Sequence, residues 1–139
     1  MTIGNFFDLT IGDIMSKDTL TTTEEVRVTE IAKKMAELNV GAVAVVNSEG
    51  GLTGILTERD MMTEILAKDI DSSKVTVGEV MTPNPKIFKP STAVPKVFRR
   101  MHDGNFRHAP VVDAGKLVGM VSIKDVDEAI LKTLEEILF

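Results

Sequence analysis

The second half of the chain repeats the first half. When the 139-residue sequence is laid on itself with a shift of 66 positions, identical residues coincide at many places. The matched residues are Gly12 with Gly78, Met15 with Met81, Val28 with Val94, Met35 with Met101, Asn39 with Asn105, and Val45-Val46 with Val111-Val112. We therefore predict two copies of one unit, residues 1–74 and 75–139, which have to pack on each other to bury their apolar faces.

Both copies contain the same order of predicted elements, so the expected fold class is mixed α/β (α+β). Apolar residues at helical spacing predict an amphipathic helix from Val28 to Leu38 and another that starts near Ser91 or Thr92, with Pro95 in its first turn. Two short apolar runs around a polar turn then predict a hairpin in each copy. The predicted strands are Ala42–Val46, Leu52–Leu56, Ala109–Val112 and Leu117–Val121, and the closing helices span 58 to about 68 and about 123 to 138.

The segment 69–76 is short and polar, and it reads as a linker between the copies that is too brief to let them move independently. The last helix is longer than its counterpart in the first copy. Its apolar stripe, which includes Val126, Ile130, Leu134, Ile137 and Leu138, needs a cover. The cover is either Phe6 and Phe7 of the same chain or a second chain in a dimer.

Composition excludes several classes of function. There is no cysteine and there are only two histidines, so disulfides, thiol nucleophiles and cysteine-held zinc are excluded, and we expect no metal site. A hydrophobic content of 43% is enough for a core, while no stretch resembles a secretion signal or a membrane span, so we expect a cytoplasmic protein. The net charge of -5 argues against a nucleic acid partner, and the lack of a long apolar stretch argues against a membrane partner, although residues 75–125 carry 8 basic and 4 acidic side chains.

A seven-residue motif occurs once in each copy, where a predicted strand runs into a helix. After a one-residue deletion in the second turn, the shift becomes 65, and Gly54, Thr57 and Asp60 align with Gly119, Ser122 and Asp125 in the form G-x-x-[T/S]-x-x-D. One interpretation is a helix cap, in which the hydroxyl and the carboxylate satisfy the first backbone groups of the helix. The other is a ligand site, in which the helix N-terminus attracts a phosphate and the carboxylate accepts hydrogen bonds from ribose hydroxyls. A cap needs no glycine three residues earlier, whereas a ligand that lies against the strand backbone does.

These duplicated features together resemble a tandem pair of cystathionine-beta-synthase-type (CBS) domains, also called a Bateman module. The resemblance covers roughly residues 9 to 131. Besides the two junctions, it rests on the segments Ile11–Met15, Val77–Pro83 and Arg107–Asp113. It implies two βαββα units related by a pseudo-twofold axis, with sheets packed against amphipathic helices. It also implies clefts between the units that hold AMP, ADP, ATP, S-adenosylmethionine or a similar adenosyl ligand.

The resemblance assigns roles to individual residues. Asp60 and Asp125 would bind ribose, Thr57 and Ser122 would meet phosphate, and the starts of the first hairpin strands would flank adenine with their backbone groups. The candidate ligand-binding residues are Ser16, Ala42, Val43, Thr57, Arg59, Asp60, Thr82, Arg107, His108, Ala109, Pro110, Ser122, Lys124 and Asp125. The first copy departs from the family pattern, because Gly41–Ala44 replaces Arg107–Pro110 and Ser16-Lys17 replaces Thr82-Pro83.

The basic residues of the second copy favour its own cleft. Arg107, His108 and Lys124 could neutralise phosphate, whereas Arg59 of the first copy is preceded by Glu58. Arg99 and Arg100 could contribute, or they could simply form the solvated face of a helix. We therefore expect the second cleft to bind more tightly and to prefer phosphorylated ligands to S-adenosylmethionine.

The sequence contains no nucleophile with a base and no paired carboxylates, so we expect a regulatory module without catalytic residues or a catalytic cofactor. Such a module senses an adenine nucleotide and transmits the bound state to an effector protein in trans. We also expect a homodimer. The alternatives are a ligand-independent dimerisation or protein-interaction module, and a sensor of S-adenosylmethionine.

Overall fold

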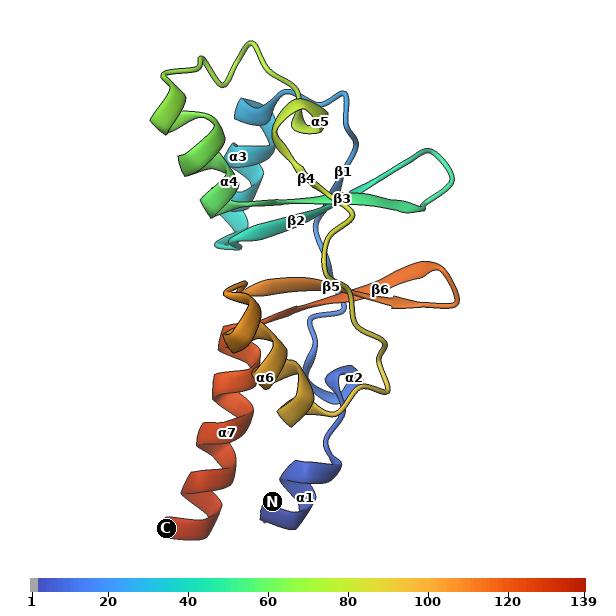
Figure 1. Cartoon of the computed structure of the whole chain (residues 1–139), viewed down its shortest axis with the longest axis vertical. Helices are drawn as coiled ribbons and strands as arrows, with labels where there is room; N and C mark the ends of the chain where they lie inside the picture. The colour runs from blue at the N-terminus through green and yellow to red at the C-terminus, as the bar shows by residue number, and fades with distance from the viewer. Residues whose placement is uncertain (1–2) are drawn as a thin grey trace. The chain divides into compact units, whose positions relative to one another are not determined.

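The computed structural model describes the backbone of residues 3–139 and the side chains from residue 6 onward. Its elements confirm the mixed α and β fold (Figure 1). The helices are α1 (Ile3–Asp8), α2 (Ile11–Ile14), α3 (Val28–Leu38), α4 (Glu58–Glu64), the short 3₁₀ helix η1 (Leu66–Lys68), α5 (Val77–Val80), α6 (Val94–Gly104) and α7 (Ile123–Leu138). The strands are β1 (Thr21–Thr22), β2 (Ala42–Val46), β3 (Leu52–Thr57), β4 (Thr82–Pro83), β5 (His108–Asp113) and β6 (Lys116–Ser122).

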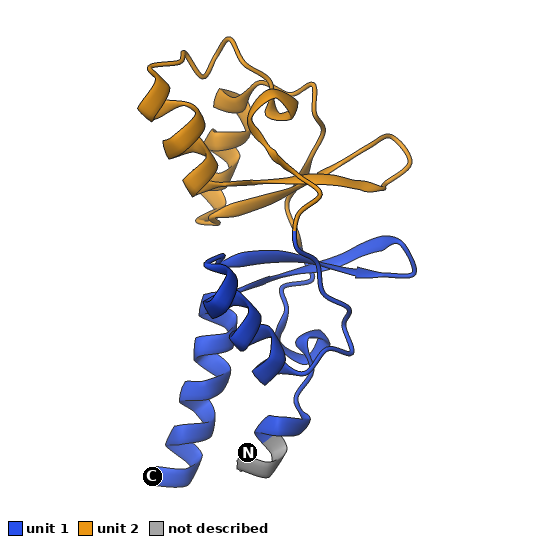
Figure 2. Ribbon diagram, viewed as in Figure 1, with its two compact units in different colours: residues 1–18, 86–139 blue, residues 19–85 orange. Residues whose placement is uncertain are grey.

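The chain forms two compact units whose limits differ from those of the sequence copies. Unit 1 combines the residues up to Asp18 with Lys86–Phe139, and unit 2 is the continuous segment Thr19–Pro85 (Figure 2). Each unit therefore contains the helix, hairpin and closing helix of one copy together with the leading segment of the other. We call residues 9–18 and 75–85 the first and second lead segments.

Unit 2 contains a four-stranded sheet in the order β1-β2-β3-β4. β1 is parallel to β2, and the other two pairs are antiparallel. In unit 1, β5 and β6 pair in the same antiparallel way, and single bridges from Phe88 to Val111 and from Ser16 to Met120 take the places of β1 and β4. Both hairpins have an irregularity at the same point, after Val45 and after Val111, so the repeat is conserved in local geometry.

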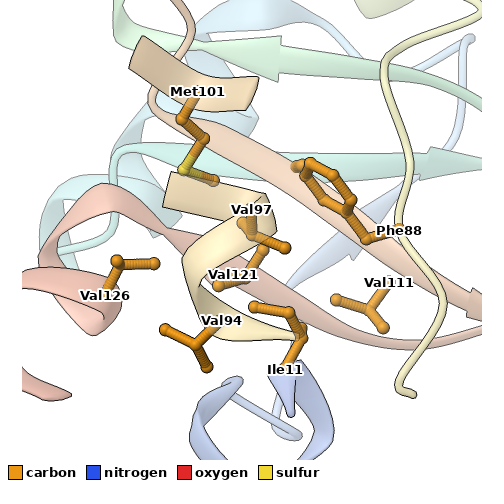
Figure 3. Close-up of a cluster of buried hydrophobic side chains, with 9 residues drawn as sticks. Ile11, Phe88, Val94, Val97, Met101, Val111, Val121 and Val126 are labelled. Atoms are coloured by element: carbon orange, nitrogen blue, oxygen red, sulfur yellow. The ribbon is translucent and has the colours of Figure 1, made fainter. Parts of the chain in front are cut away.

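Each unit has its own hydrophobic core, and each core includes residues from a lead segment. In unit 1, Ile11 is fully buried among the apolar residues of α6, β5, β6 and α7, and Figure 3 shows its side chain beside Val94 and Val111. In unit 2, Val77 and Val80 belong to the cluster that α3, β2 and β3 supply. Burying one aliphatic side chain of this size contributes about 1.5–3 kcal/mol, so the lead segments are structural parts of the units that receive them.

Helix α6 begins later than the sequence indicated. The first helical residue is Val94 and the N-cap is Ala93, so the predicted start near Ser91 or Thr92 was two to three residues early, although Pro95 does lie in the first turn. The reason is that the Val94 N–H donates to the Leu9 carbonyl at 2.9 Å. Because the first lead segment supplies this acceptor, a hydroxyl cap is not needed there.

The segment 69–76 lies within unit 2 and does not join the units, which corrects the linker interpretation. Ser72 and Val75 accept hydrogen bonds from the first N–H groups of α3, and the Ser72 hydroxyl lies 2.6 Å from that of Thr29. Asp71 accepts from the hydroxyl and the backbone N–H of Ser73, and the hydroxyl bond above all holds the pKa of this exposed carboxyl below its usual range. The chain passes between units after Asp18 and after Pro85.

The stripe on the terminal helix is only partly covered within the chain. α1 contacts α7, and Phe6 and Ile130 pack against the core of unit 1. Phe7 is 60% exposed, however, and Leu134, Ile137 and Leu138 are also exposed. Phe6 therefore contributes to the predicted cover, whereas Phe7 and the exposed residues Leu134, Ile137 and Leu138 are left outside it.

Candidate functional site

The two copies of the motif form the corners at which β3 runs into α4 and β6 runs into α7. We call them the first and second corners. Thr57 and Ser122 are the N-caps, with extended backbone angles. The Thr57 N–H donates to Asp60 Oδ2 at 2.9 Å, and the Asp60 N–H donates back to the Thr57 hydroxyl at 3.2 Å. Ser122 and Asp125 repeat this reciprocal pair at 2.8 and 3.2 Å, so the capping interpretation is confirmed at both corners.

The two N-cap hydroxyls have different hydrogen-bond geometry. Thr57 Oγ1 also lies 3.1 Å from Asp60 Oδ2 and donates to it. Ser122 Oγ takes part in its cap as an acceptor, from the Asp125 N–H. The Thr57 hydroxyl therefore both accepts and donates within its own cap, and the cap bond given for the Ser122 hydroxyl is one that it accepts.

The glycines of the motif are explained by the protein's own packing. A Cβ at Gly54 would lie 2.6 Å from Met81 Sδ and 2.9 Å from the Thr82 carbonyl oxygen. A Cβ at Gly119 would lie 2.7 Å from both Met15 Sδ and the Ser16 carbonyl oxygen. Each glycine therefore admits a lead segment against the strand, and the argument that the glycine indicates a ligand was wrong.

The lead segments reach the corners crosswise. β4, from the second lead segment, pairs with β3, so Thr82 lies opposite Ile55 and Pro83 lies opposite Gly54. Ser16 of the first lead segment exchanges two backbone hydrogen bonds with Met120, each at 2.9 Å. Thr82-Pro83 of the second copy therefore completes the first corner, and Ser16 of the first copy completes the second corner.

Thr82 also makes a side-chain contact that sequence reasoning missed. Its hydroxyl donates to Asp60 Oδ1 at 2.9 Å, across 22 residues of sequence. Both oxygens of the Asp60 carboxylate therefore accept hydrogen bonds from within the protein. The family resemblance placed Thr82 among the candidate residues, but only the β3–β4 pairing brings it to Asp60.

The start of each hairpin lies beside the corner of its own copy, as expected. His108 pairs with Ser122, and the Ile123 N–H donates to the Arg107 carbonyl at 2.8 Å. In the first copy, Ala42 pairs with Thr57, and the Glu58 N–H donates to the Gly41 carbonyl at 3.0 Å. The side chains of Ala42, Val43, Ala109 and Pro110 are buried, so these residues can offer only backbone groups to a ligand.

The cationic side chains expected at the second corner lie beside it, Lys124 in the chain and Arg107 and His108 through the pairing of β5 with β6. Arg107 and Lys124 are exposed and His108 is half-buried. At the first corner, Arg59 and Glu58 are both exposed, so the local charges cancel. Arg99 and Arg100 are on the exposed surface of α6, which fits both a contribution to phosphate binding and a solvated helix face.

The described residues contain no group of three or more acidic or imidazole side chains placed to hold a metal ion. A pocket of about 220 Å³ in unit 2 is lined by residues of β1 and α3 and by Val46. Val46 is the last residue of β2, while the first corner faces the other end of that strand. This pocket therefore contains none of the candidate residues.

Comparison with known proteins gives the family. A family model described as "CBS domain" matches residues 11–67 and again residues 77–132. The chain belongs to the CBS-domain family. The duplicated corners and the hairpins lie within the two matched CBS ranges, which begin inside the lead segments, whereas the last turns of α7 lie beyond them.

Curated CBS-domain relatives differ in length from this chain. The mitochondrial CBS domain-containing protein CBSX3 of Arabidopsis thaliana is 34% identical over 137 residues, which are 91% of this chain and 66% of the relative. CBSCBSPB5 of the same plant is 34% identical over 104 residues, but the chain spans only 19% of its length.

Solved CBS-domain structures have the same fold. The CBS domain pair of protein MJ0100, solved in complex with 5'-methylthioadenosine and S-adenosyl-L-methionine, superposes with a TM-score of 0.81 at 29% identity, covering 88% of this chain and 96% of that one. A hexameric CBS-CP12 protein from bloom-forming cyanobacteria superposes with a TM-score of 0.79 at 26% identity, covering 85% and 66%. In the described part of this chain, no helix combines the length and apolar character that a membrane crossing requires.

Proposed function

We propose that this CBS-domain pair is a regulatory module that binds an adenine nucleotide of the AMP, ADP or ATP class, principally at the second corner. The observation that carries the proposal is the composition of that corner. Ser122 and Asp125 begin a 16-residue helix, and Arg107, His108 and Lys124 are adjacent to them in the strand pair or in the chain. The bound state would be transmitted to an effector protein, without catalysis by this chain.

The chemistry of the second corner suits a nucleotide. The N-terminus of α7 carries partial positive charge, and the Ser122 hydroxyl can donate its proton to a phosphate oxygen. Arg107 and Lys124 add full positive charges to an otherwise acidic protein. The cap occupies Asp125 Oδ2, and the same carboxylate supplies acceptor capacity for ribose hydroxyls.

A second candidate ligand is S-adenosylmethionine. It is favoured by MJ0100, whose CBS pair was solved with two adenosyl compounds that carry no phosphate. Both ligand classes share the nucleoside that Asp125 would hold. They differ in the charge of the group attached to it, because a phosphate gains from Arg107 and Lys124 whereas a sulfonium does not.

Calorimetric titration with AMP, ADP, ATP, 5'-methylthioadenosine and S-adenosylmethionine tests the proposal. We expect the nucleotides to bind and Asp125→Ala to weaken them about tenfold to a hundredfold, because it removes hydrogen bonds to a charged group. We expect Arg107→Ala to weaken the nucleotides more than S-adenosylmethionine. If S-adenosylmethionine binds more tightly than the nucleotides, S-adenosylmethionine is the ligand and the nucleotide proposal is wrong.

The control has to account for the helix cap, because Asp125→Ala removes the cap as well as the acceptor for ribose. Asp13 in the same unit makes an equivalent cap with Thr10, whose N–H donates to Asp13 Oδ2 at 3.0 Å. Asp13→Ala should therefore lower stability by a similar amount, about 1 kcal/mol, without changing nucleotide affinity. Equal losses of affinity in both variants, or no binding of any compound, would favour a ligand-independent interaction module.

Self-association is also part of the proposal. The exposed leucines Leu131, Leu134 and Leu138 follow one another at i, i+3 and i+7 on α7 and so share one face. A second copy that presents the same face would cover them in a symmetric homodimer. The hexameric CBS-CP12 protein supports the idea that CBS pairs assemble, although it does not indicate which face this chain uses.

A further inference from the structure

The pocket in unit 2 lies at a position of the repeat that an aromatic side chain occupies in unit 1. Thr22 lines the pocket, and it pairs with Val45 where β1 runs parallel to β2. Phe88 makes the equivalent parallel bridge to Val111 in unit 1, so Thr22 and Phe88 are counterparts. The Phe88 ring is turned into the core of unit 1 (Figure 3) and stacks on Phe106, with the ring centroids 6.3 Å apart. Unit 2 therefore has an open pocket beside a position that a phenyl ring fills in unit 1.

The apolar walls of the pocket repeat the surroundings of Phe88. Ile31 and Val46 line the pocket, and the repeat aligns them with Val97 and Val112. Val97 belongs to the same buried cluster as Phe88, and the Val112 N–H donates to the Phe88 carbonyl at 2.9 Å. Such walls suit a planar ring, which gains free energy when it leaves water. The pocket volume of about 220 Å³ is below the roughly 300–1,000 Å³ of sites for drug-sized ligands, so the occupant is a small molecule with one ring.

Thr22 brings a buried polar group to this pocket. The residue is only 8% exposed, and its hydroxyl donates to the Thr23 carbonyl oxygen at 3.5 Å. Hydrogen bonds between a hydroxyl and an oxygen are usually about 2.5–3.0 Å long, so this contact is weak. A buried hydroxyl gains from a closer partner. A phenolic hydroxyl on a ring that enters the pocket would supply one.

Two opposite charges lie at the rim of the pocket. Glu30 and Lys34 both line it, both are exposed, and they are one helical turn apart on α3. Neither side chain makes an ion pair with another residue that the structure describes. The counterparts of Glu30 and Lys34 in unit 1 are Lys96 and Arg100, so the opposite charges are a feature of unit 2 alone. An α-amino acid carries an ammonium and a carboxylate on one carbon atom, and these two groups match Glu30 and Lys34.

We propose that the pocket binds an aromatic α-amino acid, with its ring between Ile31 and Val46. The carboxylate of the ligand points to Lys34 and its ammonium points to Glu30. A phenolic hydroxyl, as in tyrosine, meets the hydroxyl of Thr22. The pocket is at the opposite end of β2 from the first corner, so this inference does not rest on the nucleotide proposal.

Calorimetric titration of the full chain with four related compounds tests the chemistry of the site. We expect L-tyrosine to bind, and L-phenylalanine to bind about threefold to tenfold more weakly because it lacks the phenolic hydroxyl. Tyramine, which lacks the carboxylate, and 3-(4-hydroxyphenyl)propionate, which lacks the ammonium, should each bind about twofold to fivefold more weakly than L-tyrosine. Lys34→Ala should weaken L-tyrosine but not tyramine, and Glu30→Gln should weaken L-tyrosine but not the propionate. No binding of L-tyrosine at millimolar concentration, or equal binding of all four compounds, would overturn the proposal.

Substitutions that fill the pocket test its location. Thr22→Phe gives unit 2 the side chain of unit 1 and should weaken L-tyrosine at least about tenfold, because the added ring takes the space of the ligand. If Thr22→Phe does not fold, Val46→Phe fills the pocket from another wall and should have the same effect. Lys33→Ala is the matched control, since Lys33 is exposed on α3 but does not line the pocket, and it should keep the affinity within about twofold of the wild type. Unchanged affinity in the filled variants, or an equal loss in Lys33→Ala and Lys34→Ala, would show that L-tyrosine does not bind in this pocket.

Discussion

Gly119 illustrates how a residue can be predicted correctly as important and interpreted for the wrong reason. Its place in the motif suggested a ligand against the strand, but the nearest groups to a Cβ there are Met15 Sδ and the Ser16 carbonyl, both at 2.7 Å. Real Cβ atoms do not approach other atoms so closely, and a backbone carbonyl in a bridge cannot move aside freely. Gly119 is therefore needed for the unit to fold, whether or not a ligand binds.

This distinction predicts that Gly119→Ala destabilises the ligand-free protein. Overpacking of this kind costs roughly 1–3 kcal/mol, so we expect the free energy of unfolding in urea to fall by that amount. Adding Met15→Ala to Gly119→Ala should leave the carbonyl clash in place and relieve the sulfur clash. Once the effect of Met15→Ala alone is subtracted, the double variant should therefore lose less free energy of unfolding than Gly119→Ala does. Unchanged stability combined with weaker nucleotide binding would restore the ligand interpretation of the glycine.

At the scale of elements, α7 has two apolar faces with different environments. Val126, Ala129 and Thr133 are buried against unit 1, while Leu131, Leu134 and Leu138 are exposed. The CBS-domain match ends at residue 132, so the last turns of α7 lie beyond the matched range. An exposed stripe of leucines on a helix that already has a buried face is typical of an interface.

We predict that α7 holds a homodimer together through this stripe. Leu134→Glu combined with Leu138→Glu should convert the dimer to a monomer, because carboxylates at the centre of an apolar interface lose their hydration. Sedimentation equilibrium gives the mass. Leu66, which is 75% exposed in unit 2, offers a matched control, and Leu66→Glu should leave the dimer intact. A wild-type chain that is monomeric at tens of micromolar, or a doubly substituted chain that stays dimeric, would contradict this role of α7.

At the scale of the whole molecule, the local elements could be predicted but their assembly could not. The helical and alternating patterns located α3, α6, both hairpins and α7, because hydrophobic periodicity reports which face of an element is buried. The motif likewise placed Thr57, Asp60, Ser122 and Asp125 at strand-to-helix corners. These are short-range properties of the sequence.

The crosswise placement of the lead segments depends on contacts that periodicity does not report. The Gly78 N–H donates to the Glu24 carbonyl at 2.9 Å within unit 2, and the Gly12 N–H donates to the Pro90 carbonyl at 2.9 Å within unit 1. Because the copies are similar, each lead segment could in principle pair with its own copy or with the other. Similar sequences make the two choices hard to distinguish, so the pairing of Thr82 with the first corner became evident only in the folded chain.

The crossing predicts which fragments of the chain can fold. Residues 19–85 contain the whole core of unit 2, whereas a fragment of residues 1–74 lacks the buried Val77 and Val80, and one of residues 75–139 lacks the fully buried Ile11. We expect the fragment of residues 19–85 to unfold cooperatively in urea and each sequence copy alone to show no cooperative transition. Each copy lacks a lead segment whose buried aliphatic side chains contribute roughly 1.5–3 kcal/mol each, so the loss amounts to several kcal/mol of the free energy of unfolding. The unfolding transitions are measured by circular dichroism. A mixture of the fragments 1–74 and 75–139 should show a cooperative transition, because together the two fragments supply both lead segments. The opposite result would be a fragment of residues 1–74 that folds cooperatively and is as stable as residues 19–85. It would show that a lead segment can pack on its own copy, so that the crosswise placement is not needed for folding.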